Sequence, residues 1–249
     1  MLGAVSVGHG DLPTLALLHG FTQTGSSWAK IAAQLANDFH CVLFDAPGHG
    51  TSLQINTDLW QTADQVVASS GKGIYCGYSM GARMALHCAL RHPNHVGALI
   101  VVSGTPGISD EAERLERRFL DDQMAQHILA IGINRFIDEW LARPMFAGLP
   151  IDELEIANRK TNSDAGLAKS LELCGVGTQE DLWSRLGELQ MPVLIIAGAL
   201  DKKFADIAIK MHEAIADSEL RIVADSGHSV HLEKPDEFLR IVREWLSPR

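Results

Sequence analysis

The sequence lacks several features that would assign it to a class of protein at once. Its 21 Lys and Arg residues are outnumbered by 31 Asp and Glu residues, for a formal net charge of −10, so no basic excess is available to neutralise nucleic-acid phosphates. No apolar run reaches transmembrane length, and the first residues show no basic segment followed by an apolar stretch of secretory length. We therefore expect neither nucleic-acid binding nor membrane insertion.

Cysteine is scarce as well, and its four positions form no C-x-x-C pair. Two of them, Cys41 and Cys76, fall in apolar strand-like runs, where a buried free thiol is the expected state. A reduced, cytoplasmic protein is the simplest interpretation. The sequence contains no cluster of metal-ligating residues and no phosphate-binding loop, so we expect neither a metal nor a cofactor.

What the chain does contain is a regular alternation of short apolar runs and helical patterns. The 249 residues are 46% hydrophobic, as in an ordinary globular protein with a substantial core. Strands that are apolar throughout and alternate with helices are typical of a parallel sheet covered on both faces. The predicted strands are residues 15–18, 41–44, 74–77, 97–103, 191–197 and 220–223, with a possible opening strand at 2–7.

One interval breaks this rhythm. Residues 108–178 show helical patterns at about 110–132, 134–142, 151–160 and 165–173, and no strand. Ligands bind outside the carboxyl ends of the strands in open α/β sheets, so a helical insertion there is best explained as a cap over the site. We predict an α/β core of residues 1–107 and 179–249, and a cap of residues 108–178.

The motif that organises the chain is Gly77-x-Ser79-x-Gly81, at the junction of an apolar strand and a helical pattern. This is the spacing of a nucleophile elbow, in which a sharp turn presents the serine hydroxyl above the sheet. The glycines are needed because the backbone folds back closely on itself. The bare pattern is weakly specific, and its position between strand and helix makes it informative.

A nucleophilic serine requires a base and an orienting carboxylate. Asp201 follows the predicted strand 191–197, and His228 follows the strand 220–223, which is the chain order of an α/β-hydrolase triad. Three other residues are open alternatives: His231 for the base, and Asp225 or Asp206 for the acid. The oxyanion hole is expected from the backbone N–H groups of Met80 and Phe21, which follow the serine and the His19-Gly20 pair.

Arg83 lies one helical turn after Ser79, so both side chains can face the same side of the helix. A guanidinium beside the serine suits a substrate carboxylate better than an apolar ester, because arginine grips carboxylates through two parallel hydrogen bonds. The expected ligand is therefore a small, anionic molecule.

With its strand order, elbow, helical insertion and Asp201 and His228, the whole chain resembles the α/β-hydrolase superfamily. Several segments look more narrowly like the 2-succinyl-6-hydroxy-2,4-cyclohexadiene-1-carboxylate synthase family of menaquinone biosynthesis. These segments are residues 77–83, 117–123, 138–146, 158–162 and 197–204. The resemblance implies a triad of Ser79, Asp201 and His228, carboxylate-binding Arg83, Arg118 and Arg159, and pocket-lining Tyr78 and Trp140. Arg117 and Lys160 stay open as alternatives to Arg118 and Arg159.

That family eliminates pyruvate from a cyclohexene that carries succinyl, ring-carboxyl and enolpyruvyl groups. The resemblance implies that Ser79, activated by His228, removes a ring proton, although the same triad also serves acyl transfer. A carboxylesterase or C–C hydrolase that acts on an acidic substrate is the alternative function. The sequence leaves the oligomeric state open between monomer and homodimer.

Overall fold

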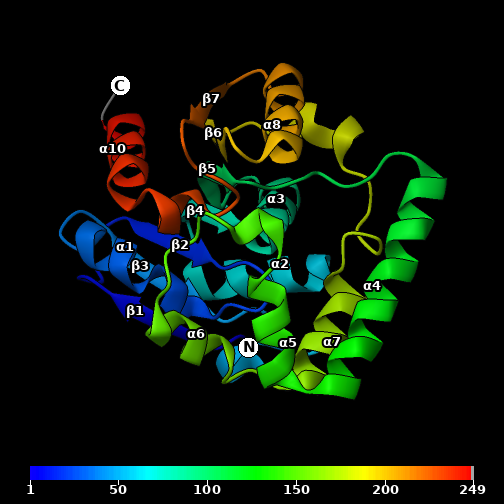
Figure 1. Cartoon of the computed structure of the whole chain (residues 1–249). Helices are drawn as coiled ribbons and strands as arrows, with labels where there is room; N and C mark the ends of the chain where they lie inside the picture. Colours follow the sequence, from blue (N-terminus) through cyan, green and yellow to red (C-terminus); the bar gives the residue numbers. More distant parts are fainter. Residues whose placement is uncertain (248–249) are drawn as a thin grey trace.

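The fold is a seven-stranded sheet with helices on both faces, shown in the computed structural model of Figure 1, which describes residues 1–247. Its strand order is β1-β3-β2-β4-β5-β6-β7, with β1 antiparallel to β3 and all other neighbours parallel. The strands are β1 (Ala4–Val7), β2 (Thr14–Leu18), β3 (His40–Phe44), β4 (Gly73–Tyr78), β5 (Val96–Val102), β6 (Val193–Gly198) and β7 (Ser218–Val223). The predicted fold class is thereby confirmed.

The α-helices lie mostly between consecutive strands. They are α1 (Ala29–Leu35), α2 (Leu59–Ser70), α3 (Met80–Arg91), α4 (Glu111–Ile131), α5 (Ile133–Leu141), α6 (Glu153–Arg159), α7 (Asp164–Cys174), α8 (Lys202–Ala214), α9 (Val230–Glu233) and α10 (Pro235–Leu246). Helix α2 begins at Leu59 because Asp58 caps it in a reciprocal capping box with Gln61. The short helix α9 was not predicted from the sequence.

The central strands are apolar throughout because both faces of the sheet are buried. In β6, Val193 and Ile195 belong to one hydrophobic cluster, whereas Leu194 and Ile196 belong to the other. This alternation follows from the period of two residues that places successive side chains on opposite faces. Helices α2, α3 and α8 cover the first face, and α1 and α10 cover the second (Figure 1).

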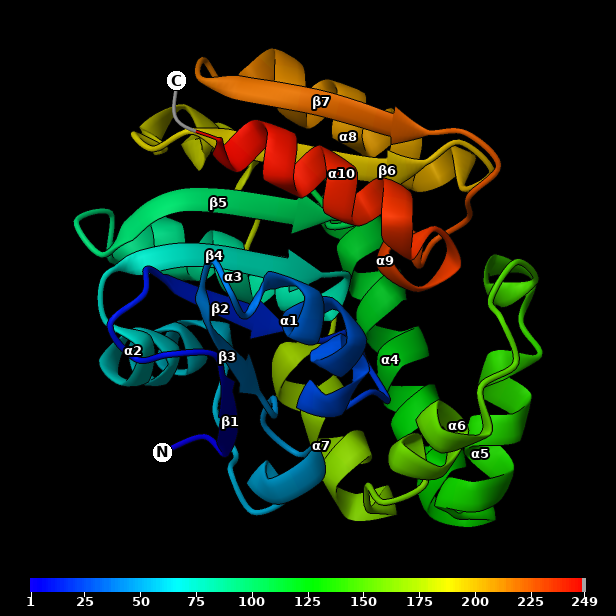
Figure 2. The ribbon, with the colours of Figure 1, turned by 90° about the vertical axis from the view of Figure 1, so that its left-hand side faces the viewer.

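Helices α4 to α7 lie between β5 and β6 in the chain and form a small hydrophobic cluster of their own. Figure 2 shows the arrowheads of β4, β5 and β7 pointing toward the end of the molecule where α4, α5 and α6 lie. The loops that follow the parallel strands open on the same end, which is where open α/β sheets bind ligands. No helix within residues 1–247 combines the length and the apolar character needed to cross a bilayer.

Candidate active site

The turn between β4 and α3 holds Ser79 in a conformation that most side chains avoid, with φ 53° and ψ −107°. The flanking glycines make the turn possible. A Cβ added to Gly77 would lie 2.1 Å from the Gly81 carbonyl oxygen, and one added to Gly81 would lie 2.1 Å from the Leu18 carbonyl oxygen. The turn is therefore pressed against its own helix and against β2, as a nucleophile elbow requires.

Ser79, His228 and Asp201 form a continuous hydrogen-bonded chain from three separate loops. The His228 Nε2 lies 3.0 Å from the Ser79 Oγ, and its Nδ1 lies 2.7 Å from the Asp201 Oδ2. A carboxylate only accepts, so Nδ1–H donates to Asp201 and leaves Nε2 to accept the serine proton. The side chain of His228 is buried, which protects this arrangement from water.

The alternative residues lie outside this chain of contacts. His231 is fully buried, and its ring stacks on that of Trp28 at a centroid distance of 4.2 Å. Asp225 is exposed after β7, and Asp206 falls within α8. Of the candidate acids and bases, Asp201 and His228 are the two that the structure brings to Ser79.

Both residues expected to supply the oxyanion donors line the same cavity as Ser79. Met80 opens α3, so its N–H has no acceptor in a preceding turn of that helix. Phe21 lies on the loop after β2, which His19 fixes: its Nδ1–H donates to the Gly20 carbonyl oxygen, and its Nε2 accepts from the Ala46 N–H. Burial lowers the pKa of His19 to about 4, so its ring stays neutral and can accept that bond.

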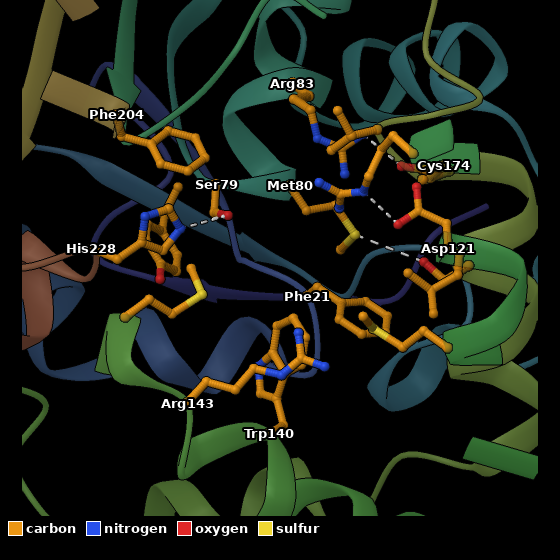
Figure 3. A pocket seen from close by; sticks show the side chains of 18 of the residues that line it. Phe21, Ser79, Met80, Arg83, Asp121, Trp140, Arg143, Cys174, Phe204 and His228 are labelled. Carbon is orange, nitrogen blue, oxygen red and sulfur yellow. Dashed lines mark hydrogen bonds and ion pairs between the residues drawn. The ribbon is translucent and has the colours of Figure 1, made fainter. Parts of the chain in front are cut away.

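A cavity of about 560 Å³ opens above these residues, and Figure 3 shows part of its lining. Its walls combine the triad with apolar and aromatic side chains from α4 to α7, and with an unusual number of cations. The lining residues are Phe21, Tyr78, Ser79, Met80, Arg83, Arg117, Leu120, Asp121, Met124, Trp140, Arg143, Met145, Phe146, Arg159, Ser170, Leu171, Cys174, Gly175, Val176, Asp201, Lys203, Phe204 and His228.

The charge inside the cavity is opposite in sign to that of the whole chain. Four arginines and Lys203 line it, against the carboxylates of Asp121 and Asp201. Both carboxylates already have partners, since Asp121 pairs with Arg117 at 2.8 Å and Asp201 holds His228. The cavity thus has a surplus of cations that suits an anionic ligand.

Arg83 is the most unusual of these cations because it is buried without a carboxylate. Its Nη1 donates to the Cys174 carbonyl oxygen at 2.6 Å, and the ion pairs found within residues 1–247 do not include it. Burial lowers the pKa of Arg83 to about 10, with a further contribution from the neighbouring Arg117. Binding of a carboxylate here would offset the desolvation of the guanidinium.

Of the two candidates on α4, Arg117 lines the cavity and the expected Arg118 does not. Arg117, Asp121 and Met124 lie on one face of α4 at spacings of four and three residues, and all three line the cavity. Arg118 is turned about 100° from Arg117 by the helical repeat and is exposed.

This assignment predicts different outcomes for two neighbouring substitutions. Replacing Arg117 by methionine should lower kcat/KM about tenfold, as expected for loss of one hydrogen bond to a charged group. It should also lower the melting temperature, because Asp121 loses its cation. The matched variant Arg118→Met should stay within about twofold of wild type, and the reverse ranking in steady-state kinetics would return Arg118 to the site.

The remaining predicted residues line the cavity. Arg159 is buried and pairs with Glu155 at 3.2 Å, whereas the alternative Lys160 pairs with Asp138 at 2.6 Å. Tyr78 places its hydroxyl 2.7 Å from the Ser229 Oγ. Trp140 contacts the Phe21 ring edge-to-face at a centroid distance of 5.4 Å.

Several lining residues were not singled out from the sequence, chiefly Arg143, Phe146, Lys203 and Phe204. The Arg143 guanidinium lies 4.4 Å from the Trp140 ring centroid, which is a cation–π contact across three residues of sequence. The spacing of three residues between Trp140 and Arg143 is a sequence signal from which this contact could have been predicted. Phe146 and Phe204 flank the His228 ring from different segments, which no local pattern shows.

Comparison with known proteins agrees with this geometry. Residues 13–235 match the model of the alpha/beta hydrolase fold family. A Bacillus subtilis relative with the provisional name 2-succinyl-6-hydroxy-2,4-cyclohexadiene-1-carboxylate synthase is 37% identical over 92% of this chain and 89% of its own. The synthase of that name from Pectobacterium atrosepticum is 32% identical, over 94% of each chain.

Among solved structures, MenH from S. aureus superimposes with a TM-score of 0.91 and 31% identity, covering 99% of this chain and 98% of its own. The match extends over both the sheet and helices α4 to α7, because so little of either chain is left out. The chain therefore belongs to the alpha/beta hydrolase fold family and, within it, to the 2-succinyl-6-hydroxy-2,4-cyclohexadiene-1-carboxylate synthases.

Proposed function

We propose that the protein is a lyase that eliminates pyruvate from 2-succinyl-5-enolpyruvyl-6-hydroxy-3-cyclohexene-1-carboxylate. The product is 2-succinyl-6-hydroxy-2,4-cyclohexadiene-1-carboxylate, which is the compound in the relatives' names. The observation that carries the proposal is Arg83, a buried cation without a carboxylate partner, one helical turn from Ser79. An uncharged ester would leave that guanidinium without a partner, whereas a substrate with three carboxylates can pair with it.

The proposed reaction is a 1,4-elimination that begins at the ring carbon next to the succinyl carbonyl. His228 Nε2 accepts the Ser79 proton, and the serine oxygen removes the ring proton. The electrons of that C–H bond form the C2=C3 double bond, the former C3=C4 pair shifts to C4=C5, and the C5–O bond breaks. The leaving enolpyruvate takes a proton from His228 and becomes pyruvate, which returns the triad to its starting state.

Asp201 and two backbone N–H groups would stabilise the charges that form during this reaction. Asp201 holds the imidazole in the tautomer that accepts at Nε2 and stabilises the imidazolium that forms. The N–H groups of Phe21 and Met80 would stabilise the enolate oxygen that develops on the succinyl carbonyl. In this proposal Ser79 acts as a base and forms no acyl-enzyme.

Residues 108–178 act as a cap over this site in our proposal. Fourteen of the cavity residues, from Arg117 to Val176, come from α4 to α7 and the loops that join and follow them, including Arg117, Arg143 and Arg159. The cap therefore supplies most of the cations for the substrate, while the core supplies the reacting groups. A cytoplasmic location also belongs to this proposal, since all four cysteines are free and buried.

The direct test is pyruvate release from the enolpyruvyl substrate, followed continuously with lactate dehydrogenase and NADH. We expect wild-type protein to release one pyruvate per diene formed, the diene being measured by its ultraviolet absorbance. Rapid hydrolysis of aryl esters without pyruvate release would instead support a carboxylesterase and overturn the synthase assignment.

The cavity charges also predict how the rate responds to salt. Arg143 is exposed beside the Trp140 ring and lines the cavity. With Lys203, it forms a local positive field in a protein whose net charge of −10 repels anions at longer range.

We expect kcat/KM to fall about threefold or more between low and physiological salt, because exposed charges are screened over about 8 Å at 0.15 M. The double variant Arg143→Gln, Lys203→Gln should have a lower kcat/KM at low salt and a shallower salt dependence. If the salt dependence of kcat/KM were equally steep in the wild type and the double variant, these cations would not attract the substrate.

A further inference from the structure

Thr22, the residue after the expected oxyanion donor Phe21, is held in an unfavourable backbone conformation. It is fully buried and has φ 70°, a left-handed value that is rare for a β-branched residue. Such a conformation persists only where neighbouring groups hold it in place. The contacts of Thr22 therefore show what fixes the oxyanion loop.

All three polar groups of Thr22 have a partner outside their own loop. Its N–H donates to the His49 Nε2 at 3.3 Å, and its carbonyl oxygen accepts from the Asn162 Nδ2 at 2.7 Å. Its hydroxyl oxygen accepts from the Arg159 Nη1. Two of the three partners thus come from one turn of chain at the end of α6.

Asn162 joins this turn to a second loop of the core. Its Nδ2 also donates to the Arg159 carbonyl oxygen at 3.0 Å, and its Oδ1 accepts from the Gly50 N–H at 2.8 Å. Both kinds of group in the amide are in use, so the orientation of the side chain is fixed. Asn162 is buried and is not among the cavity residues, so it does not touch the substrate itself.

We propose that Asn162 is a positioning residue that locks the oxyanion loop to the end of α6, so that carboxylate recognition by Arg159 and oxyanion stabilisation by Phe21 belong to one rigid unit. The inference rests on the proposed function. Arg159 forms the other half of the unit, because it lines the cavity while its Nη1 holds Thr22. Its buried Nε has no hydrogen-bond partner within residues 1–247.

The catalytic consequence follows from geometry. Oxyanion donors act only when they lie at hydrogen-bond distance from the developing charge, and the loss of one costs about 10²- to 10³-fold in kcat. A misplacement of about 1 Å already causes a large loss. Releasing Thr22 should therefore slow the chemical step and leave the binding of the substrate carboxylates almost unchanged.

The test uses Asn162→Ala and Asn162→Asp in the full-length chain, with pyruvate release as the assay. Aspartate has nearly the same shape as asparagine and keeps an acceptor for the Gly50 N–H. It replaces the donor to the Thr22 carbonyl oxygen with a second acceptor, so the hydrogen bond to Thr22 is lost. We expect kcat to fall at least about tenfold in both variants, with KM within about threefold of wild type. The control is Asn158→Ala, one turn earlier on α6, which should leave both parameters near wild type.

A second pair of variants covers the case in which Asn162 variants fail to fold. Thr22→Val keeps the shape of the side chain but removes the hydroxyl that accepts from Arg159, whereas Thr22→Ser keeps that hydroxyl. We expect a reduced kcat for valine and near wild-type kcat for serine, a rescue that a purely structural role would not produce.

The outcomes separate this inference from the function on which it rests. Wild-type protein that releases no pyruvate overturns the proposed function. An active wild type, with kcat unchanged in folded Asn162 variants or equal in the two Thr22 variants, overturns the inference alone. A raised KM at constant kcat also overturns it, because Asn162 would then act on binding.

Discussion

Replacing Ser79 by alanine is expected to lower kcat for pyruvate release by at least about 10³-fold, while the substrate binds almost as tightly as to wild type. A positioned acid–base group contributes about 10²- to 10⁴-fold to the rate. Members of a triad act as a unit, so loss of the Ser79 hydroxyl also removes the catalytic contribution of His228. The carboxylates would still meet the arginines, which lie outside the hydrogen-bonded chain of the triad. The measurements are single-turnover kinetics for the chemical step and titration calorimetry for binding.

The matched control for Ser79→Ala is Ser170→Ala, in the same cavity. Ser170 is a buried lining residue whose hydroxyl contacts the Met80 sulfur at 3.7 Å and takes no part in the triad. We expect less than about threefold change in kcat for this variant. A Ser79→Ala protein that kept a tenth of wild-type activity would show that another group removes the ring proton.

The same reaction tests whether Ser79 acts as a base or as an acylated nucleophile. Acid quenching of wild-type protein during turnover, followed by mass spectrometry of the intact chain, should reveal only the unmodified mass. A covalent adduct that forms and decays at the rate of turnover would contradict the elimination mechanism and support acyl transfer.

The second large effect is expected at Arg83. Replacing it by methionine should lower kcat/KM about 30- to 4,000-fold, since truncating one partner of a buried charge pair costs about 2–5 kcal/mol. Arg83→Lys should restore little, because an ammonium offers a point charge in place of the planar, two-pronged donor. Steady-state kinetics at several substrate concentrations give these values.

Stability should change in the opposite sense from activity at this position. The folded protein buries the Arg83 guanidinium without a carboxylate partner, and this desolvation disfavours folding in the absence of substrate. We expect Arg83→Met to melt at or above the wild-type temperature, even though the Cys174 carbonyl oxygen loses its donor. A clear fall in melting temperature would show that Arg83 is a structural residue.

Arg91→Met is the control for both measurements, because Arg91 lies on the same helix α3 but is exposed and pairs with Asp64 at 2.6 Å. Exposed ion pairs contribute about 0–1 kcal/mol, so activity and melting temperature should both stay near wild type. A similar loss of activity in Arg91→Met would mean that charge on α3, and not its place in the cavity, affects the rate.

The sequence by itself determined the sheet and the chain order of the triad. Central strands such as β6 are buried on both faces and so are apolar throughout, which makes them visible as short runs. Gly77 is required by a backbone contact with Gly81, four residues away, so this part of the elbow is a local feature, whereas Gly81 is required by its contact with Leu18 on β2. The positions of Asp201 and His228 follow, because each lies on the loop after a recognisable strand.

Only the tertiary structure decided which cations of α4 to α7 line the cavity and which groups hold the loop that contains Thr22. On α4 the cavity side carries Arg117 and Asp121, polar residues that a hydrophobic pattern assigns to solvent, so periodicity alone favoured no choice between Arg117 and Arg118. The contact between Asn162 and Thr22 spans 140 residues. Its physical origin is the packing of one end of α6 on two core loops, which depends on where the cap helices lie and not on any local spacing.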